Sequence, residues 1–202
     1  MTARVASRPP ERAARGGTGR ADSRRNRARL LAAAGEELQR GQQFTLADVA
    51  ERARLSPATA YRHFSSAEEV VEAYVGGFWD DVDARARAIA ADDFPAFCRA
   101  WVDAVLEWGP ALVYLRSRDG FLARRSAADP RVGRLLAVVE PRIQAELRAA
   151  GTSCSPELSY VLAVWNALAD PREVLDQRQA LGWSGARLSD NMCRTVRAAI
   201  RR

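Results

Sequence analysis

The sequence is poor in the residues that build metal, disulfide and nucleophilic sites. It has one histidine, His63, and three cysteines that lie far apart, Cys98, Cys154 and Cys193. An odd number of scattered cysteines with no histidine near any of them argues against both a disulfide framework and a zinc site. No glycine-rich phosphate-binding motif is present, and no nucleophile can be assigned near His63. These absences predict a protein that is not an enzyme and needs no metal or cofactor.

Long apolar runs and alternating patterns are also missing. No run approaches the roughly 20 apolar residues that span a bilayer, and residues 1–20 lack the apolar centre of a signal peptide. We therefore expect a cytoplasmic protein without membrane contact. No useful stretch alternates apolar and polar residues, whereas apolar residues recur at helical spacing along the chain. The sequence predicts an all-α fold of eight to ten helices.

Lysine is absent, so all 31 basic residues are arginines, and they are unevenly distributed. Residues 1–29 hold nine arginines against Glu11 and Asp22, a net charge of +7 in a chain whose total is +6, so residues 30–202 sum to −1. This asymmetry predicts an arm attracted to phosphates or another polyanion, with a solubilising tail as the alternative. Two prolines and three glycines predict that this arm, residues 1–23, is disordered.

The residues after the arm include several that mark the beginnings of helices. Residues 24–40 have the periodicity of an amphipathic helix. Thr45 with Asp48 three positions later predicts the capped start of a second helix. Ser56 and Pro57 predict the start of a third, because a hydroxyl precedes a proline at the first helical position. A short helix, a tight turn and a capped helix suit a helix-turn-helix, whose second helix enters the major groove.

Two runs of residues make this prediction more specific. The run from Phe44 to Ala50 contains Thr-x-x-Asp-Val-Ala, and the run from Leu55 to Phe64 ends in Tyr-Arg-His-Phe. Together they resemble the N-terminal domain of the TetR family of bacterial regulators over about 50 residues. The resemblance implies a sequence-specific transcriptional regulator, by default a repressor, that binds a palindromic operator in double-stranded DNA as a homodimer.

The resemblance also implies a domain plan. A three-helix helix-turn-helix DNA-binding domain is expected over residues 24–74, and a helical ligand-binding and dimerisation domain over residues 75–202. The alternatives are a nonspecific, nucleoid-type nucleic-acid-binding protein, which the basic arm alone would suit, and a regulator controlled by a protein partner instead of a small-molecule effector.

By resemblance, Thr45 contacts a phosphate and several residues of the third helix lie on or near the DNA surface. Their chemistry agrees, because hydroxyls donate to phosphate oxygens, a small side chain admits a close approach, and an arginine binds guanine or phosphate. These residues are Ser56, Ala58, Thr59, Tyr61, Arg62 and His63. A capping role for Ser56, a core position for Tyr61 and a packing role for His63 remain open.

The sequence departs from the family pattern in two places. Ala67 stands where the family commonly has a phosphate-anchoring lysine, and Pro57-Ala58 replaces a more usual pair of a small residue and glycine. The arm is a plausible replacement for the missing anchor, because its cations release counterions from DNA or enter the adjacent minor groove. The favoured members are Arg24, Arg25 and Arg27. Deleting residues 1–20 is expected to weaken operator binding and its salt dependence.

The C-terminal part offers a candidate interface and a candidate pocket. Two apolar stripes suit a four-helix contact between subunits, with intramolecular core as the alternative: Leu158, Leu162 and Trp165, then Leu188, Met192, Val196 and Ile200. Aromatic walls with polar handles suit an effector pocket, again with core as the alternative. The pocket candidates are Phe97, Trp101, Trp108, Tyr114, Arg116, Trp165 and Asn166.

Overall fold

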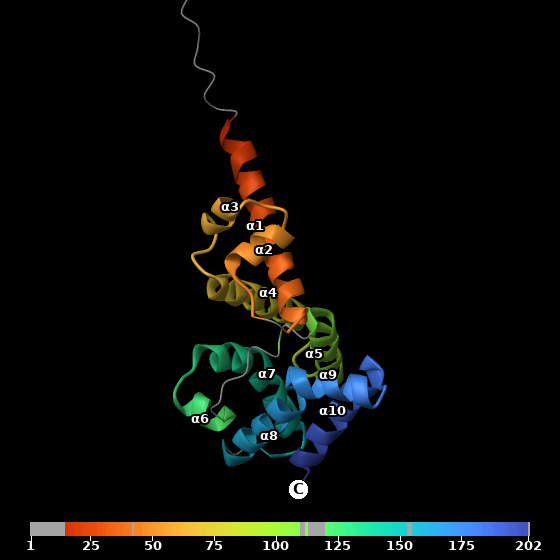
Figure 1. Ribbon diagram of the computed structural model, residues 1–202. Coiled ribbons are helices and arrows are strands. Elements are labelled where there is room, and N and C mark those ends of the chain that lie inside the picture. Colours follow the sequence, from red (N-terminus) through yellow and green to blue (C-terminus); the bar gives the residue numbers. More distant parts are fainter. Residues whose placement is uncertain (1–14, 42, 110–111, 113–119, 153–154, 202) are drawn as a thin grey trace, which may run out of the picture. The chain divides into compact units, whose positions relative to one another are not determined.

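The computed structural model describes residues 15–41, 43–109, 112, 120–152 and 155–201. These residues form ten helices and no strand, so the predicted all-α fold is confirmed (Figure 1). The chain divides into two compact units, of which the first ends at Val71 and the second begins at Glu72. None of the helices in the described part of the chain is long and apolar enough to cross a lipid bilayer.

The first unit contains α1 (Arg15–Gln39), α2 (Leu46–Arg52), α3 (Pro57–Tyr61) and the first turn of α4 (Ala67–Arg87). Helix α2 packs against both α1 and α3. The apolar sides of the three helices are buried, and so is Phe64, which follows α3. The buried side chains include Leu30, Ala34, Leu38, Leu46, Val49, Ala50, Ala60 and Phe64.

Helix α1 begins earlier than its sequence suggests. Residues 15–23 were expected to belong to the disordered arm, but they are helical, so that expectation was wrong. Helix initiation is the costly step, whereas extending a formed helix adds one hydrogen bond for each residue ordered. Arginine and alanine, both good helix formers, therefore carry the helix back through a glycine-containing stretch. Residues 1–14 of the predicted arm lie outside the described residues.

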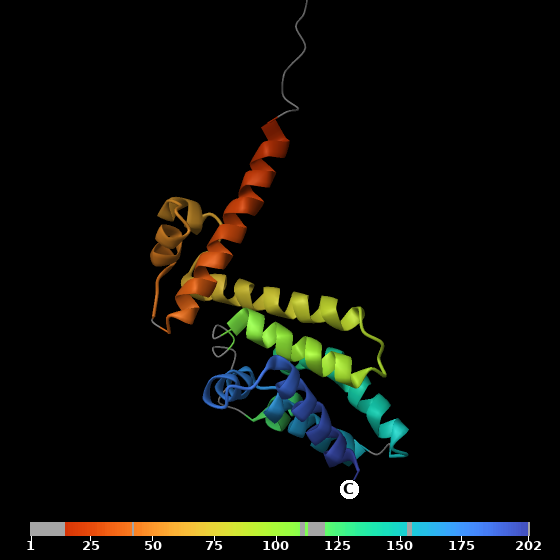
Figure 2. The same cartoon turned by 90° about the vertical axis from the view of Figure 1, so that its right-hand side faces the viewer.

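The second unit contains most of α4 and six further helices. Helices α5 and α10 pack together extensively, and α10 also contacts α8 and α9 (Figure 2). The helices after α4 are α5 (Phe94–Trp108), α6 (Phe121–Ser126), α7 (Pro130–Ala149), α8 (Ser155–Leu168), α9 (Pro171–Ala180) and α10 (Gly185–Ile200). Three of them begin with an aspartate cap and a proline in the first turn, in which the absent N–H removes no intrahelical bond.

A buried arginine ties α7 to the end of α4. Arg142 is 7% exposed, and its guanidinium donates hydrogen bonds to the backbone carbonyls of Ala86 (2.6 Å), Ile89 (3.4 Å) and Val138 (2.6 Å). The same guanidinium stacks 4.6 Å from the centre of the Phe97 ring. Carbonyls at the C-terminal end of a helix carry partial negative charge, so they compensate part of the cost of burying this cation. Burial nevertheless lowers the pKa of Arg142.

Candidate nucleic-acid interface

Helix α2 begins with a reciprocal cap between Thr45 and Asp48. The Asp48 amide donates to Thr45 Oγ1 (3.3 Å), while the Thr45 amide and hydroxyl donate to Asp48 Oδ2 at 2.7 and 2.8 Å. These bonds stabilise the charged carboxylate, so they lower the pKa of Asp48. The only hydroxyl proton of Thr45 is therefore engaged within the cap, and phosphate contact by Thr45 stays a prediction.

The turn between α2 and α3 uses a left-handed residue that is not glycine. Arg54 has a φ of +53°, a conformation that ordinary residues adopt at a cost of about 1 kcal/mol or more. Arg29 of α1 donates hydrogen bonds to the carbonyls of Ala53 (2.5 Å) and Arg54 (3.1 Å). A cation placed on the last carbonyls of a helix stabilises its C-terminal end. The first helix therefore holds the turn that orients α3.

A second arginine joins α2 to α1. Arg52 is hydrogen-bonded to Glu37, a nearly buried carboxylate, and its Nη1 lies 3.3 Å from Glu36 Oε2. The two carboxylates raise the pKa of Arg52, the hydrogen bond with Glu37 being the larger cause. Neither Arg29 nor Arg52 was identified as important from the sequence, because the partners of both lie outside the helical spacings that a local pattern shows.

Helix α3 carries a connected row of polar side chains on its exposed side. Ser56 caps the helix by accepting from the Thr59 amide (3.2 Å), and the Ser56 and Thr59 hydroxyls are 2.9 Å apart. Arg62 Nη2 then donates to Thr59 Oγ1 (3.0 Å). One bond occupies one of five guanidinium N–H groups, so Arg62 keeps donors for phosphate or guanine. The capping role of Ser56 is thus real, and it coexists with an exposed position.

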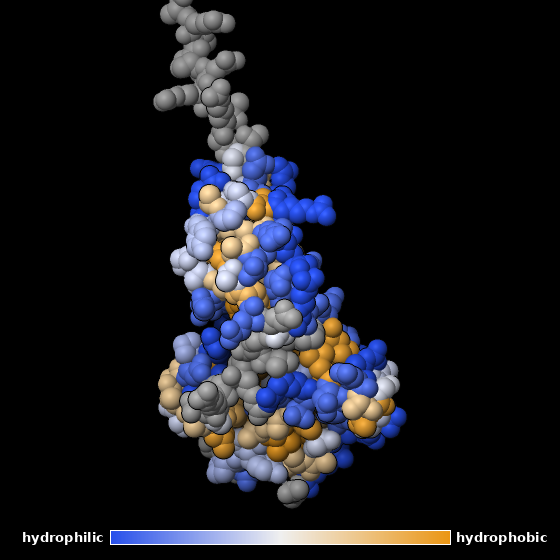
Figure 3. Space-filling model, viewed as in Figure 1, coloured by the Kyte–Doolittle hydropathy of each residue, from blue (hydrophilic) through white to orange (hydrophobic). Residues whose placement is uncertain are grey.

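The other predicted residues of this surface divide between exposed and partly covered positions. Tyr61 is 57% exposed, Ala58 is exposed, and His63 is half-buried. Ala60 and Phe64 point instead into the core of the first unit. Over α3, Figure 3 shows intermediate hydropathy, in contrast to the hydrophilic surface along the N-terminal half of α1. Helix α3 therefore has one face for packing and one face open to a partner.

The three favoured arginines of α1 differ in their surroundings. Arg27 stacks 4.8 Å from the centre of the Phe64 ring, and Arg25 pairs with Asp22. Arg24 is exposed and contacts no partner among the described residues. Arg24 is therefore the freest of the three to bind a phosphate, while Arg27 also covers the core residue behind α3.

Helix α4 begins with a cap that presents negative charge. Ser66 Oγ accepts from the Glu69 amide (3.3 Å), and the Ser65 amide and hydroxyl donate to Glu69 Oε2 at 2.5 and 2.7 Å. These bonds lower the pKa of Glu69, and a hydrogen bond from Ser66 lowers that of Glu68. Ala67, in the expected position of a phosphate-anchoring lysine, offers no polar group.

Residues 30–74 match the family model described as bacterial regulatory proteins, tetR family. These residues form a TetR-type DNA-binding domain. The match covers the core-forming part of α1, both helices of the helix-turn-helix and the start of α4. No curated protein and no solved structure matches the chain. The similarity to the tetR family therefore lies almost entirely in the first unit.

In the second unit, the predicted pocket residues are packed in the interior. Phe97, Trp101 and Trp165 are all less than 5% exposed, and the Trp101 and Trp165 rings lie 4.9 Å apart. Trp108 contacts Tyr74 and donates to Asp81 Oδ2 (3.1 Å). Asn166 is half-buried. Tyr114 and Arg116 lie outside the described residues.

Phe97 and Trp101 line only a small hollow beside α4, and the two larger described cavities are elsewhere in this unit. One of about 640 Å³ is lined by residues of α10 and Pro95, and one of about 370 Å³ includes Val174, Trp183 and Met192. Among the predicted pocket residues that the structure describes, none lines either of these two cavities. In the described ranges, no group of three or more histidine, cysteine, aspartate or glutamate residues is placed to hold a metal ion.

The two predicted interface stripes are mostly covered within a single chain. Leu158 is half-buried, whereas the remaining members are less than 9% exposed: Leu162, Trp165, Leu188, Met192, Val196 and Ile200. They pack where α10 meets α5 and α8. Their burial agrees with the alternative of intramolecular core, so a subunit contact through α8 and α10 would need the outward faces of these helices.

Proposed function

We propose that this protein is a homodimeric repressor that reads a palindromic operator with α3 of each subunit and is released by a small-molecule effector. The observation that carries the proposal is the row formed by exposed Ser56, half-buried Thr59 and exposed Arg62 along α3, inside a TetR-type domain. Hydroxyl and guanidinium donors on one helical face suit the phosphate oxygens and base edges of a major groove.

Rigidity of the reading helix supports the proposal. Helix α3 has five residues, Pro57–Tyr61, too few to be stable alone. Its geometry depends on the Ser56 cap, the turn held by Arg29, and the burial of Ala60 and Phe64. A side chain that is already positioned loses less entropy on binding, so these contacts favour specific over nonspecific association.

A dimer is part of the proposal because one short helix reads only a half-site. Two-fold related heads reach half-sites about 34–36 Å apart, one turn of the duplex. The outward side of α8 includes the exposed Tyr160 and is the part of the predicted interface helices left for such a contact. An effector releases the operator only when it binds the DNA-incompetent arrangement more tightly, since equal affinity shifts no equilibrium.

Selection of bound duplexes from a random pool, followed by footprinting, tests the DNA-reading part. We expect a palindromic consensus protected over two half-sites. Tyr61→Ala is expected to weaken binding roughly tenfold. Leu181→Ala, which changes an apolar residue of similar exposure in the second unit, outside α8 and α10, should leave operator affinity unchanged. Binding without preference over random competitor at moderate salt would instead support the nonspecific alternative.

Light scattering and ligand screening test the remaining parts. A dimer mass at micromolar concentration is expected, and a purely monomeric protein would contradict the proposed operator symmetry. A small molecule that raises the melting temperature and lowers operator affinity would identify the effector class. Release of the operator by another protein, with no response to small molecules, would contradict the effector part alone.

A further inference from the structure

Two free cysteines meet where α5 packs against α10. Cys98 of α5 is fully buried, and Cys193 of α10 is 6% exposed. The two thiols lie close enough for each to influence the pKa of the other. Along the chain the same two cysteines look unrelated, because 94 positions separate them. Folding therefore brings together two thiols that the sequence gives no reason to pair.

The packing of the two helices explains why these positions face each other. At the start of α10, a Cβ on Gly185 would lie 3.2 Å from Leu106 Cδ1 and 3.9 Å from Val102 Cγ1. Further along α10, Cys193 and Arg197 share a cavity with Pro95. Residues near the start of α10 therefore contact the later part of α5, and residues further along α10 lie near the start of α5. This antiparallel register places Cys98 opposite Cys193.

Small side chains let the helices approach closely at this contact. Gly185, Ser189 and Cys193 follow one another at four-residue spacing on α10, and Ser189 is 2% exposed. A disulfide needs Cα atoms about 4.4–6.8 Å apart, closer than most helix pairs allow. The close packing of α5 and α10 at these small residues therefore favours an approach of the two sulfurs to bonding distance.

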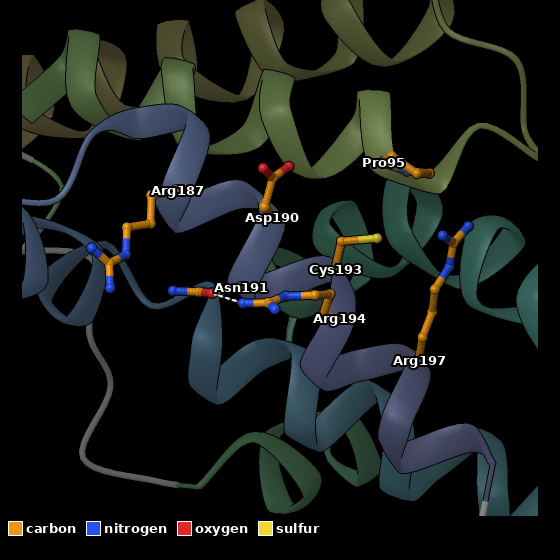
Figure 4. Close-up of a pocket in the computed structure, with 7 residues that line it drawn as sticks. All are labelled: Pro95, Arg187, Asp190, Asn191, Cys193, Arg194 and Arg197. Carbon is orange, nitrogen blue, oxygen red and sulfur yellow. Dashed lines mark hydrogen bonds between the residues drawn. The ribbon is translucent and has the colours of Figure 1, made fainter.

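The two thiols differ in access. Cys193 lines an open cavity of about 640 Å³ together with Pro95, Asp190, Arg194 and Arg197. In Figure 4, Cys193 leaves α10 on the side toward the helix that carries Pro95. Cys98 lines none of the described cavities and is completely covered. A small oxidant would therefore meet Cys193 first.

The two thiols also differ in acidity. The polar neighbour Cys98 and, to a smaller extent, the nearby charge of Arg197 lower the pKa of Cys193 to about 7. Glu146 of α7 and Asp190 oppose this effect, but Glu146 is held by Arg197 in two bonds of 2.7 and 2.8 Å. The same pairing and burial raise the pKa of Cys98. The more accessible thiol, Cys193, is thus also the more acidic of the two.

We infer that Cys98 and Cys193 are a redox-active dithiol, in which a hydroperoxide oxidises Cys193 and Cys98 then closes a disulfide between α5 and α10. The Cys193 thiolate attacks the peroxide oxygen, the O–O bond breaks, and the leaving alkoxide takes a proton, which leaves a sulfenic acid on Cys193. Cys98 sulfur then attacks Cys193 sulfur, and the displaced hydroxide leaves as water with the Cys98 proton. Two thiols and one peroxide give one disulfide, one alcohol and one water.

The test uses the full-length chain with Cys154→Ser, so that only the inferred pair remains. After the reductant is removed, the native protein is treated with one equivalent of hydrogen peroxide. We expect both thiols to disappear from a thiol titration in denaturant and unreduced peptide mapping to join the peptides of Cys98 and Cys193. The closed loop is long, so the melting temperature should rise by roughly 5–10 °C, reversibly with reductant.

Single variants test the assigned order of events. Cys98→Ser should stop at a sulfenic acid on Cys193 that dimedone traps, whereas Cys193→Ser should leave Cys98 unmodified. Equal reactivity of the two variants would overturn the assignment of Cys193 as the attacking thiol. Two titratable thiols after oxidation of the folded protein, or a disulfide found only between chains, would overturn the inference itself, even if a serine variant folds poorly.

A pH profile separates the chemistry from simple proximity. Arg197→Gln removes the cation beside Cys193, so the midpoint of the rate of oxidation against pH should move upward. Arg194→Gln is the matched control, because Arg194 lines the same cavity and bonds to Asn191 but does not influence the Cys193 pKa. Identical pH profiles for both variants would contradict the inferred effect of the Arg197 charge on the acidity of Cys193.

Discussion

Arg29 of α1 binds the backbone carbonyl of Arg54, the left-handed residue at the turn of the helix-turn-helix, at 3.1 Å. The bond links the first helix to a turn 25 positions away, in a unit whose reading helix is only five residues long. The strained backbone at Arg54 is thus compensated by a cation from another element. Arg29, one of the arginines of the basic N-terminal region, therefore supports the turn of the helix-turn-helix.

Replacing Arg29 tests this support. Arg29→Gln should lower the free energy of unfolding of the first unit by about 1 kcal/mol, because two hydrogen bonds to helix-end carbonyls are removed. Operator affinity should fall up to about fivefold in consequence. Amide hydrogen exchange over residues 53–56, together with denaturant titration, would measure the effect. Arg24→Gln is the control, since exposed Arg24 contacts no described residue; it should leave stability unchanged, and equal destabilisation by both variants would contradict this role.

The caps of α2 and α4 predict an acid limit for the first unit. Asp48, Glu68 and Glu69 have pKa values below their ordinary 3.8 and 4.5 because hydrogen bonds stabilise their charged forms. Groups with a lowered folded pKa stabilise the fold above the unfolded value and lose that contribution as pH falls through the folded one. Stability of the first unit should therefore fall below about pH 4.5. Thermal melts of Asp48→Asn should show a weaker pH dependence there; a profile identical to that of the parent protein would contradict the capping contribution.

Shortening the chain tests whether its basic N-terminal residues bind DNA. Deleting residues 1–14 removes Arg4, Arg8 and Arg12 but leaves α1 intact. For each DNA phosphate that no longer has an arginine beside it, the slope of log affinity against log salt should decrease by about 0.9. The slope should therefore fall by roughly 1 to 3 units in a titration at several salt concentrations. The full-length chain with the three arginines changed to glutamine should behave alike, and an unchanged slope in both would leave these residues without a DNA contact.

A single substitution of Arg142 is expected to lower the free energy of unfolding of the second unit substantially. Arg142→Met fills similar space but leaves the carbonyls of Ala86 and Ile89 without their donor, so unfolding should become easier by about 2 kcal/mol. Chemical denaturation with an unchanged m value would measure this change. Arg148→Met, an exposed arginine of the same helix, is the control and should have little effect. A neutral Arg142→Met would mean that removal of the buried charge offsets the missing bonds.

The sequence by itself determined where most helices start and that a helix-turn-helix is present. The reason is that caps act over three residues: Thr45 with Asp48, and Ser56 with the Thr59 amide, bond within reach of a local pattern. Periodicity likewise showed which side of α10 is apolar. It did not show what covers that side, because the same stripe suits a partner subunit or the chain's own core.

Only the tertiary structure decided which distant residues become neighbours. It brought Arg29 to the turn, Arg142 to the end of α4 and Cys98 to Cys193. It also carried α1 back to Arg15, where composition had predicted disorder. These outcomes depend on the packing of whole helices, and a side chain's partner across such a contact is set by register and distance rather than by its neighbours in the chain.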